Sequence, residues 1–243
     1  MRRPYHMKRL LPIIIILAVL GVAVGSVVYM TRTKPLSTAA NQNQVQGPTA
    51  KPSPTLGPVK TGVPGADPPH TVGPANAPVR LEEFGDFECP PCGAFHPILK
   101  QMKEEFGDRL QITYREFPLA NHQHAIPAAS AAEAAGLQGK FWEMHAVIFE
   151  NQNKWKTEFD VKSVFESYAK QIGLDVERFK RDVESDRVEQ RIFLDGKRAR
   201  SLGVNSTPTV FLNDREVPFQ MLPPETMRVL ILDQLKAAGV QQK

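Results

Sequence analysis

The chain has 243 residues, of which 42% are hydrophobic and 23% charged, and its formal net charge is +4. Its positive charge is concentrated at the start: residues 1–69 hold eight Lys and Arg against one acid, whereas residues 70–243 hold 22 against 25 Asp and Glu. The C-terminal part is therefore mildly acidic. We expect no nucleic-acid partner, because no basic stripe interleaved with aromatic residues is present.

The first feature along the chain is an uncharged apolar run from Leu10 to Met30. At 1.5 Å per residue such a helix can span about 30 Å of hydrocarbon. Four basic residues precede it: Arg2, Arg3, Lys8 and Arg9. Positive charge favours the cytoplasmic side, so residues 1–33 are expected to form a cytoplasmic tip and a transmembrane signal-anchor. A cleaved signal peptide is the alternative, since "A-V-G" before Ser26 loosely matches a cleavage site.

Residues 34–70 are rich in Pro, Thr, Ser, Gly, Gln and Asn, with too few apolar residues to bury a core. We expect a disordered, semi-rigid linker here. The folded domain is then expected over residues 71–243, a length that suits one domain.

The domain begins with a strand-like run over residues 79–87 and continues into a helix beyond the cysteines. Apolar residues recur along that helix with helical spacing: Phe95, Ile98, Leu99, Met102 and Phe106. Alternating apolar and polar residues predict a second strand over residues 110–117.

A helical insertion is expected over about residues 121–201. Helices are predicted over residues 161–172 and about 186–202, and the basic run 197–200 is expected on a solvated helix face. A β-hairpin is predicted over residues 209–217 around Asn213 and Asp214, followed by a last helix over about 225–238. This order predicts an α/β fold whose small sheet is interrupted by helices.

Both cysteines of the chain, Cys89 and Cys92, lie in "E-C-P-P-C-G-A-F" at residues 88–95. A staple over so short a loop would stabilise the fold by only about 2 kcal/mol. A closed zinc site needs four ligands, and His96 could add only a third. A reversible dithiol is the main interpretation, and a Cys/His metal site stays as the alternative.

The position of the pair favours redox chemistry. A thiol at a helix N-terminus meets free backbone N–H groups and the positive end of the helix dipole, which stabilise a thiolate. Cys89 is therefore predicted to point outward as the attacking thiolate. Cys92, one turn further along, points inward and resolves the mixed disulfide. Pro91 fits the first helical turn.

Three segments carry a resemblance to a known family: "G-D-F-E-C-P-P-C", "Q-G-K-F-W-E-M-H" and "G-V-N-S-T-P-T-V-F-L-N". Over about residues 71–238 the chain resembles the DsbA-type thiol:disulfide oxidoreductases. The resemblance implies a thioredoxin-like fold with a helical insertion. It also implies a bacterial inner-membrane location, with the N-terminus cytoplasmic and the catalytic domain periplasmic.

The resemblance also assigns site residues. Pro208 matches the cis-proline beside the disulfide, and Thr207 matches the residue whose backbone pairs with substrate, with Pro90 and Pro91 on the substrate side. Glu83 matches a buried acid that exchanges a proton with the second cysteine. An ordinary strand-edge proline and an exposed strand glutamate are the alternatives at 208 and 83.

The expected function is formation of disulfides in reduced exported proteins, with a quinone-linked membrane oxidase as the reoxidising partner implied by the resemblance. No organic cofactor or metal is implied. The Pro-Pro pair matches neither the histidine-containing DsbA motif nor the Gly-Pro of thioredoxins, so it does not set the redox potential. A reductase or isomerase of the same fold and a metal carrier using Cys89, Cys92 and His96 remain as alternatives.

Overall fold

The computed structural model describes residues 55–240. The expected signal-anchor and most of the expected linker lie outside this range. Within it, no helix is both long and apolar enough to cross a bilayer.

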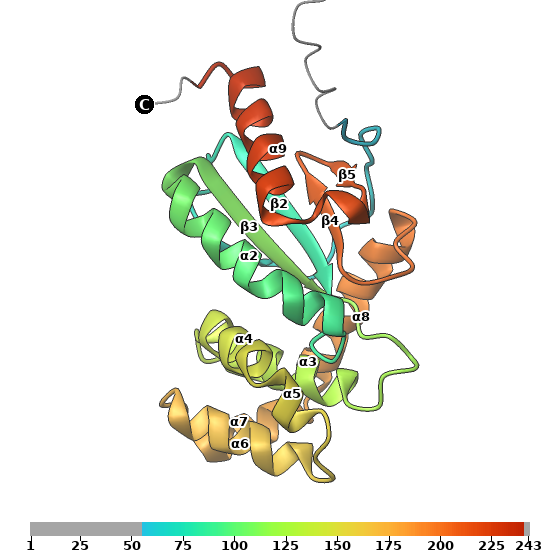
Figure 1. Ribbon diagram of the computed structural model, residues 1–243. Coiled ribbons are helices and arrows are strands. Elements are labelled where there is room, and N and C mark those ends of the chain that lie inside the picture. The colour runs from blue at the N-terminus through green and yellow to red at the C-terminus, as the bar shows by residue number, and fades with distance from the viewer. Residues whose placement is uncertain (1–54, 241–243) are drawn as a thin grey trace, which may run out of the picture. The chain divides into compact units, whose positions relative to one another are not determined.

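A five-stranded sheet forms the centre of the fold (Figure 1). Its strands are β1 (His70–Val72), β2 (Val79–Gly85), β3 (Leu110–Glu116), β4 (Thr209–Leu212) and β5 (Arg215–Val217), in the order β1-β3-β2-β4-β5. The central strands β2 and β3 run parallel, and each of the other pairs is antiparallel. The carboxyl ends of β2 and β3 therefore lie at the same end of the sheet, and the cysteines follow shortly after β2 in the sequence.

Helices α2 (Pro90–Phe106) and α9 (Pro224–Ala237) pack together on one face of the sheet. Their buried side chains are Phe95, Leu99, Met102 and Phe106 from α2, and Met227, Leu230, Ile231 and Leu235 from α9. Burial of each such side chain stabilises the fold by roughly 1.5–3 kcal/mol. The apolar face predicted for α2 is confirmed, except that Ile98 is only half-buried.

Helix α8 (Asp186–Ser201) covers the opposite face, where Ala199 packs with Phe84 and Phe211. The expectation of a solvated basic face over residues 197–200 is wrong for Arg198. Its guanidinium makes two hydrogen bonds to the Glu82 carboxylate, at 2.8 and 2.7 Å. Strand alternation puts Glu82 on this face, and Arg198 of α8 neutralises its charge there.

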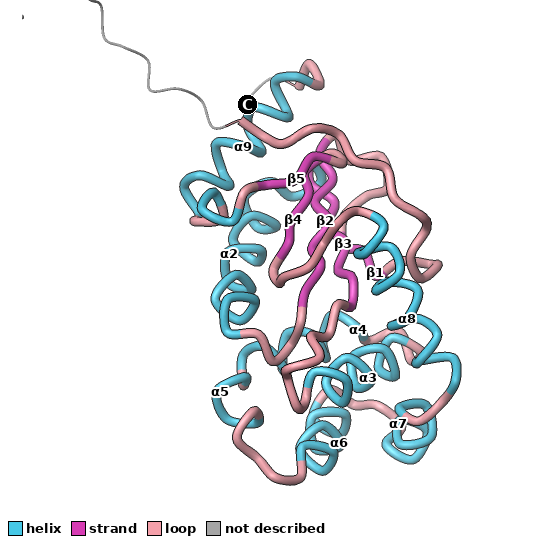
Figure 2. Tube along the Cα trace, turned by 90° about the vertical axis from the view of Figure 1, so that its right-hand side faces the viewer, coloured by secondary structure: helices cyan, strands magenta, loops and turns pink. Residues whose placement is uncertain are grey.

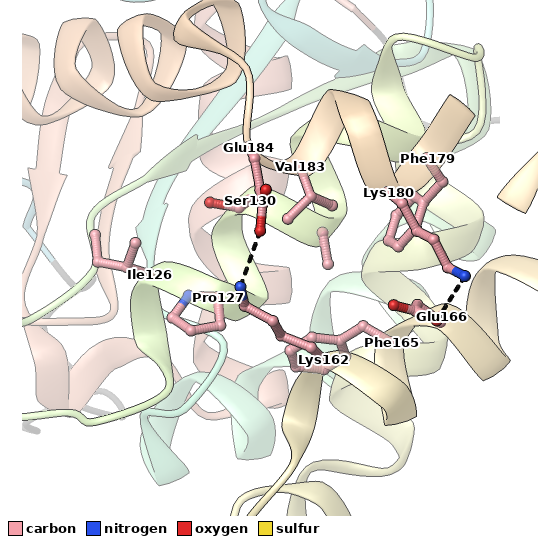
Figure 3. Close-up of a pocket in the computed structure, with 11 residues that line it drawn as sticks. Ile126, Pro127, Ser130, Lys162, Phe165, Glu166, Phe179, Lys180, Val183 and Glu184 are labelled. Carbon is pink, nitrogen blue, oxygen red and sulfur yellow. Dashed lines mark hydrogen bonds and ion pairs between the residues drawn. The ribbon is translucent and has the colours of Figure 1, made fainter. Parts of the chain in front are cut away.

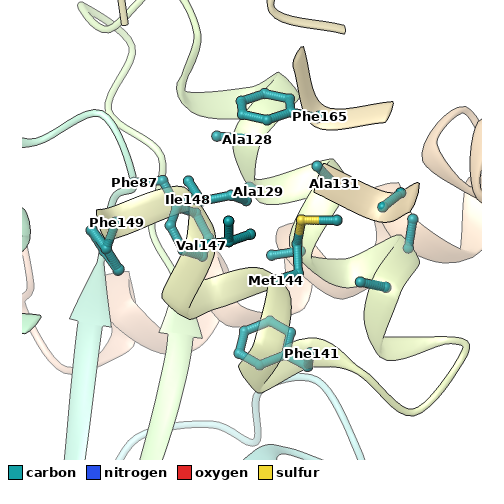
Figure 4. Close-up of a cluster of buried hydrophobic side chains, with 14 of the residues drawn as sticks. Phe87, Ala128, Ala129, Ala131, Phe141, Met144, Val147, Ile148, Phe149 and Phe165 are labelled. Carbon is teal, nitrogen blue, oxygen red and sulfur yellow. The ribbon is translucent and has the colours of Figure 1, made fainter. Parts of the chain in front are cut away.

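The helical insertion lies between β3 and β4 in the sequence, and most of it extends beyond the ends of the strands (Figure 2). Besides α8 it contains α3 (Ala125–Gly136), α4 (Phe141–Glu150), α5 (Gln152–Trp155), α6 (Val161–Gln171) and α7 (Val176–Val183). The alanines of α3 are buried against Met144, Ile148 and Phe165 (Figure 4). Small side chains on α3 let these helices approach closely, and the same cluster includes Cys92. The insertion thus supports the cysteine site from one side.

The predicted β-hairpin agrees closely with the structure. Strands β4 and β5 occupy the predicted hairpin, and the turn residues Asn213 and Asp214 have positive φ angles of 46° and 64°. That geometry belongs to the two-residue turn whose twist matches a β-hairpin. Strand β1 was not predicted, because three residues carry too little pattern.

The expected boundary between linker and domain is wrong, because residues 55–69 pack against the domain. The Gly57 amide donates to the Glu216 carbonyl at 3.0 Å, and Lys60 forms a 2.6 Å ion pair with Glu216. The Ala66 amide donates to Asp195 at 2.7 Å. Composition alone misplaced this segment, since its order comes from hydrogen bonds and ion pairs to distant residues, together with burial of Ala66 and packing of Leu56 against the core.

Asp195 is the main anchor of this segment. Its buried carboxylate accepts hydrogen bonds from Arg115 at 2.8 Å and from the amides of Ala66 and Glu116. Replacing Asp195 with alanine would leave these donors unpaired, so we expect the free energy of unfolding to fall by roughly 3 kcal/mol. Urea titration checks this value. Glu184→Ala, which breaks an exposed ion pair with Lys162, is the control and should cost less than about 1 kcal/mol; equal losses would contradict the assignment.

Candidate active site

Cys89 is the residue that caps the N-terminus of α2, and the helix starts at Pro90. Proline suits the first helical positions because its missing N–H would have no partner there. Both cysteines are free thiols. The prediction that Cys89 points outward is wrong in degree: Cys89 is only 5% exposed and Cys92 fully buried. The exposed side of the motif is formed by Pro90 and Pro91.

Helix α5 of the insertion contacts the backbone around Cys89 through Gln152. Its side-chain amide donates to the carbonyls of Phe87 at 2.7 Å and Cys89 at 2.9 Å. Gly93 makes this contact possible, because a Cβ atom at that position would lie 2.6 Å from Gln152 Oε1. Sequence reasoning missed Gln152, and only the glycine after the second cysteine hinted at a close neighbour.

Two acids flanking the motif hold the segment that follows β3. Asp86 accepts hydrogen bonds from the amides of Glu88 and Leu119 and pairs with His122 Nδ1 at 2.7 Å. The Glu88 carboxylate accepts from the His124 amide. These contacts bring residues 118–124 beside the cysteines. Neither acid was predicted, because nothing local in the sequence shows its distant partners.

The loop before β4 brings Pro208 and Thr207 to the site. The peptide bond between them is cis, and Pro208 is buried, so the expected cis-proline is present. In its protonated form the Cys89 thiol donates a hydrogen bond to the Thr207 carbonyl oxygen, with a sulfur–oxygen distance of 3.3 Å. The backbone of residue 207 therefore lies next to the reactive sulfur, where a bound chain would meet both.

The two thiols differ strongly in acidity. The pKa of Cys89 is lowered from 9.0 to about 6, first by a hydrogen bond with the Cys92 side chain and also by one with the Cys92 backbone amide, while burial opposes the shift. Burial raises the pKa of Cys92 well above its ordinary value, and its interaction with Cys89 acts in the same direction. The helix terminus was expected to stabilise the thiolate, but the Cys92 side chain lowers the pKa of Cys89 more than the backbone amide does. At pH 7 Cys89 is mostly ionised and Cys92 keeps its proton.

Glu83 lies beneath the cysteines with its side chain 1% exposed. It shares a strand face with Leu81, so the buried position is the one adopted, and the exposed alternative is excluded. Burial first, and then the charge of Cys89, raise the pKa of Glu83 from 4.5 to about 8. A carboxyl group with this pKa can give or take a proton near neutral pH.

The third potential metal ligand does not complete a metal site. His96 stacks on Phe149 with ring centroids 5.4 Å apart. Over residues 55–240, no group of three or more His, Cys, Asp and Glu side chains is arranged to hold a metal ion.

A cavity of about 410 Å³ lies elsewhere, within the insertion (Figure 3). Helices α3, α6 and α7 line it, and the ion pairs Lys162–Glu184 and Lys180–Glu166 lie at its rim. Neither cysteine contacts it, so it is separate from the redox site.

Together, the sheet order, the cysteine pair at the N-terminus of α2 and the adjacent cis-proline define a thioredoxin-fold protein with a dithiol site. A family model described as thioredoxin matches residues 66–233. The chain therefore belongs to the thioredoxin family.

Solved structures show the same architecture. Oxidised BdbD from Bacillus subtilis superposes with a TM-score of 0.64 at 23% identity, covering 73% of this chain and 98% of BdbD. A thioredoxin-like oxidoreductase from Silicibacter pomeroyi gives 0.60 at 25% identity, covering 70% and 94%. Alpha-DsbA1 of Wolbachia pipientis gives 0.61 at 18%, covering 71% and 94%. These similarities confirm the expected thioredoxin-like fold with its DsbA-like helical insertion.

Among curated sequences, the chain is similar to part of a protein named Na(+)/H(+) antiporter NhaA 1 from Mycolicibacterium vanbaalenii, at 40% identity over 149 residues. The match covers 59% of this chain and 23% of that protein. The chain thus spans less than a quarter of the length of such relatives, and the transport activity in their name is not carried over.

Proposed function

We propose that this protein is a thiol:disulfide oxidoreductase that works as an oxidase, passing the disulfide of Cys89 and Cys92 to reduced exported proteins. The observation that carries this direction is the low pKa of Cys89, about 6. A stabilised thiolate favours the reduced form of the enzyme, which makes its disulfide the stronger oxidant. The corresponding cysteine has a pKa of about 7 in the reductase thioredoxin and about 3.5 in the oxidase DsbA, so the value for Cys89 lies on the oxidase side of thioredoxin.

The reaction follows from the positions of the two sulfurs. A substrate thiolate attacks Cys89 Sγ of the oxidised pair, a mixed disulfide forms, and Cys92 leaves as a thiolate that takes a proton from Glu83. A second substrate thiolate then attacks the substrate sulfur, and Cys89 leaves as a thiolate. The substrate loses two electrons and the enzyme gains them; one substrate proton is in effect transferred to Cys92 and the other goes to solvent.

Substrate binding is assigned to the surface around Cys89. The backbone at Thr207 would pair with an extended substrate chain, and the exposed Pro90 and Pro91 would contact its side chains. Such backbone pairing gives affinity with little sequence preference, which suits an enzyme with many unfolded substrates.

The proposed setting is the bacterial inner membrane, with residues 1–33 as the anchor and the redox domain on the periplasmic side. The support is the uncharged run of Leu10 to Met30 and the basic residues before it. The reduced pair is proposed to be reoxidised by a membrane oxidase.

The test uses the full chain and a reduced, unfolded protein with two cysteines as substrate. Stoichiometric oxidised enzyme should form the substrate disulfide within minutes while Cys89 and Cys92 become reduced. If the enzyme is instead recovered oxidised, and a disulfide-bonded substrate is reduced by the dithiol form, the enzyme is a reductase and the proposal is wrong.

A further inference from the structure

A second set of acidic and hydroxyl groups lies buried beyond Glu83. Strand pairing places Glu83 opposite Tyr114, and Gly85 opposite Glu116. Residues two apart on a strand share a face, so Glu83, Tyr114 and Glu116 lie on one face of the sheet. All three side chains are buried, with exposed fractions of 1% each.

These side chains are short of protein partners. Over the described residues, eight buried side-chain oxygen or nitrogen atoms have no hydrogen-bond partner, and five of the eight belong to one group of residues. They are Glu83 Oε2, Tyr114 OH, both carboxylate oxygens of Glu116, and Glu133 Oε1. Buried polar atoms nearly always have partners, and internal water supplies them where protein does not. Adjacent atoms of this kind fit a buried, water-bridged chain.

The absence of a side chain at Gly85 makes room for the Tyr114 ring in this group. A Cβ atom at residue 85 would lie 2.6 Å from the Tyr114 hydroxyl oxygen and 2.5 Å from its ring. The tyrosine ring therefore occupies the position of the missing side chain, between Glu83 and Glu116 along the strand face.

The chain reaches the surface through α3. Glu133 pairs with His70 Nε2 at 2.8 Å, and the His70 side chain is 15% exposed. Arg191 also contacts Glu133 and His70. The His70 side chain thus connects the buried carboxyl groups to solvent.

Electrostatics agrees with this geometry. The charged groups that act on Glu116 come from every element around it: Glu133 of α3, Asp195 and Arg191 of α8, and Asp86 after β2. Burial first, and then the negative charge of Glu133, raise the pKa of Glu116 well above its ordinary range. Burial and the Glu116 charge likewise raise the pKa of Tyr114. Both shifts favour the protonated forms of Glu116 and Tyr114, which a proton relay requires.

We propose that Tyr114 and Glu116 form a proton relay that connects Glu83 to solvent at Glu133 and His70. This inference rests on the proposed function, in which Glu83 gives a proton to the Cys92 thiolate. The Glu83 carboxylate then regains a proton from Glu116 through the Tyr114 hydroxyl and bridging water, and solvent reprotonates Glu116. No electrons move along the relay, and one proton is taken from solvent for each one given to Cys92.

Infrared difference spectra between the oxidised and reduced full-length protein test the relay directly. Two carboxylic-acid signals should change with the redox state of the cysteines, one lost in Glu83→Gln and the other in Glu116→Gln. Glu82→Gln is the matched control, because Glu82 lies on the opposite face of the same sheet and is ion-paired with Arg115 and Arg198; it should leave both signals in place. A Glu116→Gln spectrum identical to the wild-type one would overturn the proposal.

Tyr114→Phe provides a second test that does not depend on a buried charge change. It removes an oxygen without a protein partner, so the fold should be retained. Dithiothreitol loses two thiol protons as it reduces the pair, and the protein takes up one of them because Cys89 stays ionised. A pH indicator should therefore record proton release followed by uptake of one proton through the relay. In Tyr114→Phe the uptake phase should slow by about tenfold, which is less than the roughly 10²–10⁴-fold that a positioned proton-transfer group contributes. An unchanged rate would exclude the relay, whereas failure of dithiothreitol to reduce the wild-type pair, or of that pair to oxidise a substrate, would instead refute the proposed function.

Discussion

Replacement of Cys92 by alanine is expected to lower the rate of substrate oxidation to the uncatalysed background, while a mixed disulfide between Cys89 and an added disulfide-bonded substrate accumulates. Cys92 is fully buried behind Cys89, so it is the only thiol of the chain placed to release Cys89 from such a complex. Without it, Cys89 can still attack, although its thiolate loses the stabilising hydrogen bond from Cys92, and the mixed disulfide cannot resolve. Mass spectrometry of acid-quenched, alkylated mixtures would show the adduct.

The matched control is Cys89→Ala, which keeps the buried thiol and removes the reactive one. It should form no adduct, because the pKa of Cys92 is raised by burial and its sulfur is inaccessible. Adduct formation by Cys89→Ala at the rate seen for Cys92→Ala would reverse the assigned roles.

Replacement of Glu83 by glutamine should stabilise the reduced protein and impair its chemistry. Because the pKa of Glu83 is about 8 in the folded protein and 4.5 when unfolded, the folded state keeps a proton between these values that the unfolded state releases. Stability therefore falls as pH rises from 4.5 to 8, by about 1.4 kcal/mol per pH unit. Glutamine removes this loss, so the variant should gain up to about 3 kcal/mol at pH 7 and nothing below pH 4.5.

Denaturant titrations at pH 5 and pH 7.5 measure this effect, and single-turnover oxidation measures the chemical one. The stability gain should be larger at pH 7.5, while release of Cys92 becomes slower. Glu82→Gln should behave oppositely and lose stability at both pH values, since Glu82 binds two arginines. A gain independent of pH would show that Glu83 is ionised in the folded protein.

Much of the fold could be predicted because its signals are local. The apolar face of α2, the alternation in β3 and the Asn213–Asp214 turn each depend on a few neighbouring residues. The pair Cys89 and Cys92 was equally visible, because two cysteines three positions apart before an apolar helix have few other uses.

The features that were missed depend on distant partners. Gln152 contacts the cysteine loop from 63 residues away. No local sequence pattern identifies an isolated glutamine as a residue that holds this loop. Residues 55–69 resemble a linker in composition, yet Asp195 binds their backbone. The exposure of Cys89 was overestimated because Thr207, 118 positions later, covers it.

The redox potential of the Cys89–Cys92 pair, measured at pH 7 by equilibration with glutathione buffers, tests the central claim most directly. A thiolate held by the hydrogen bond from Cys92 stabilises the reduced form, so the potential should lie between about −180 and about −120 mV. Each 30 mV corresponds to about 1.4 kcal/mol of stabilisation of the reduced pair. A potential near about −270 mV, where thioredoxin lies, would mean that the Cys89 thiolate does not stabilise the reduced pair more than in a reductase and that the protein does not act as an oxidase.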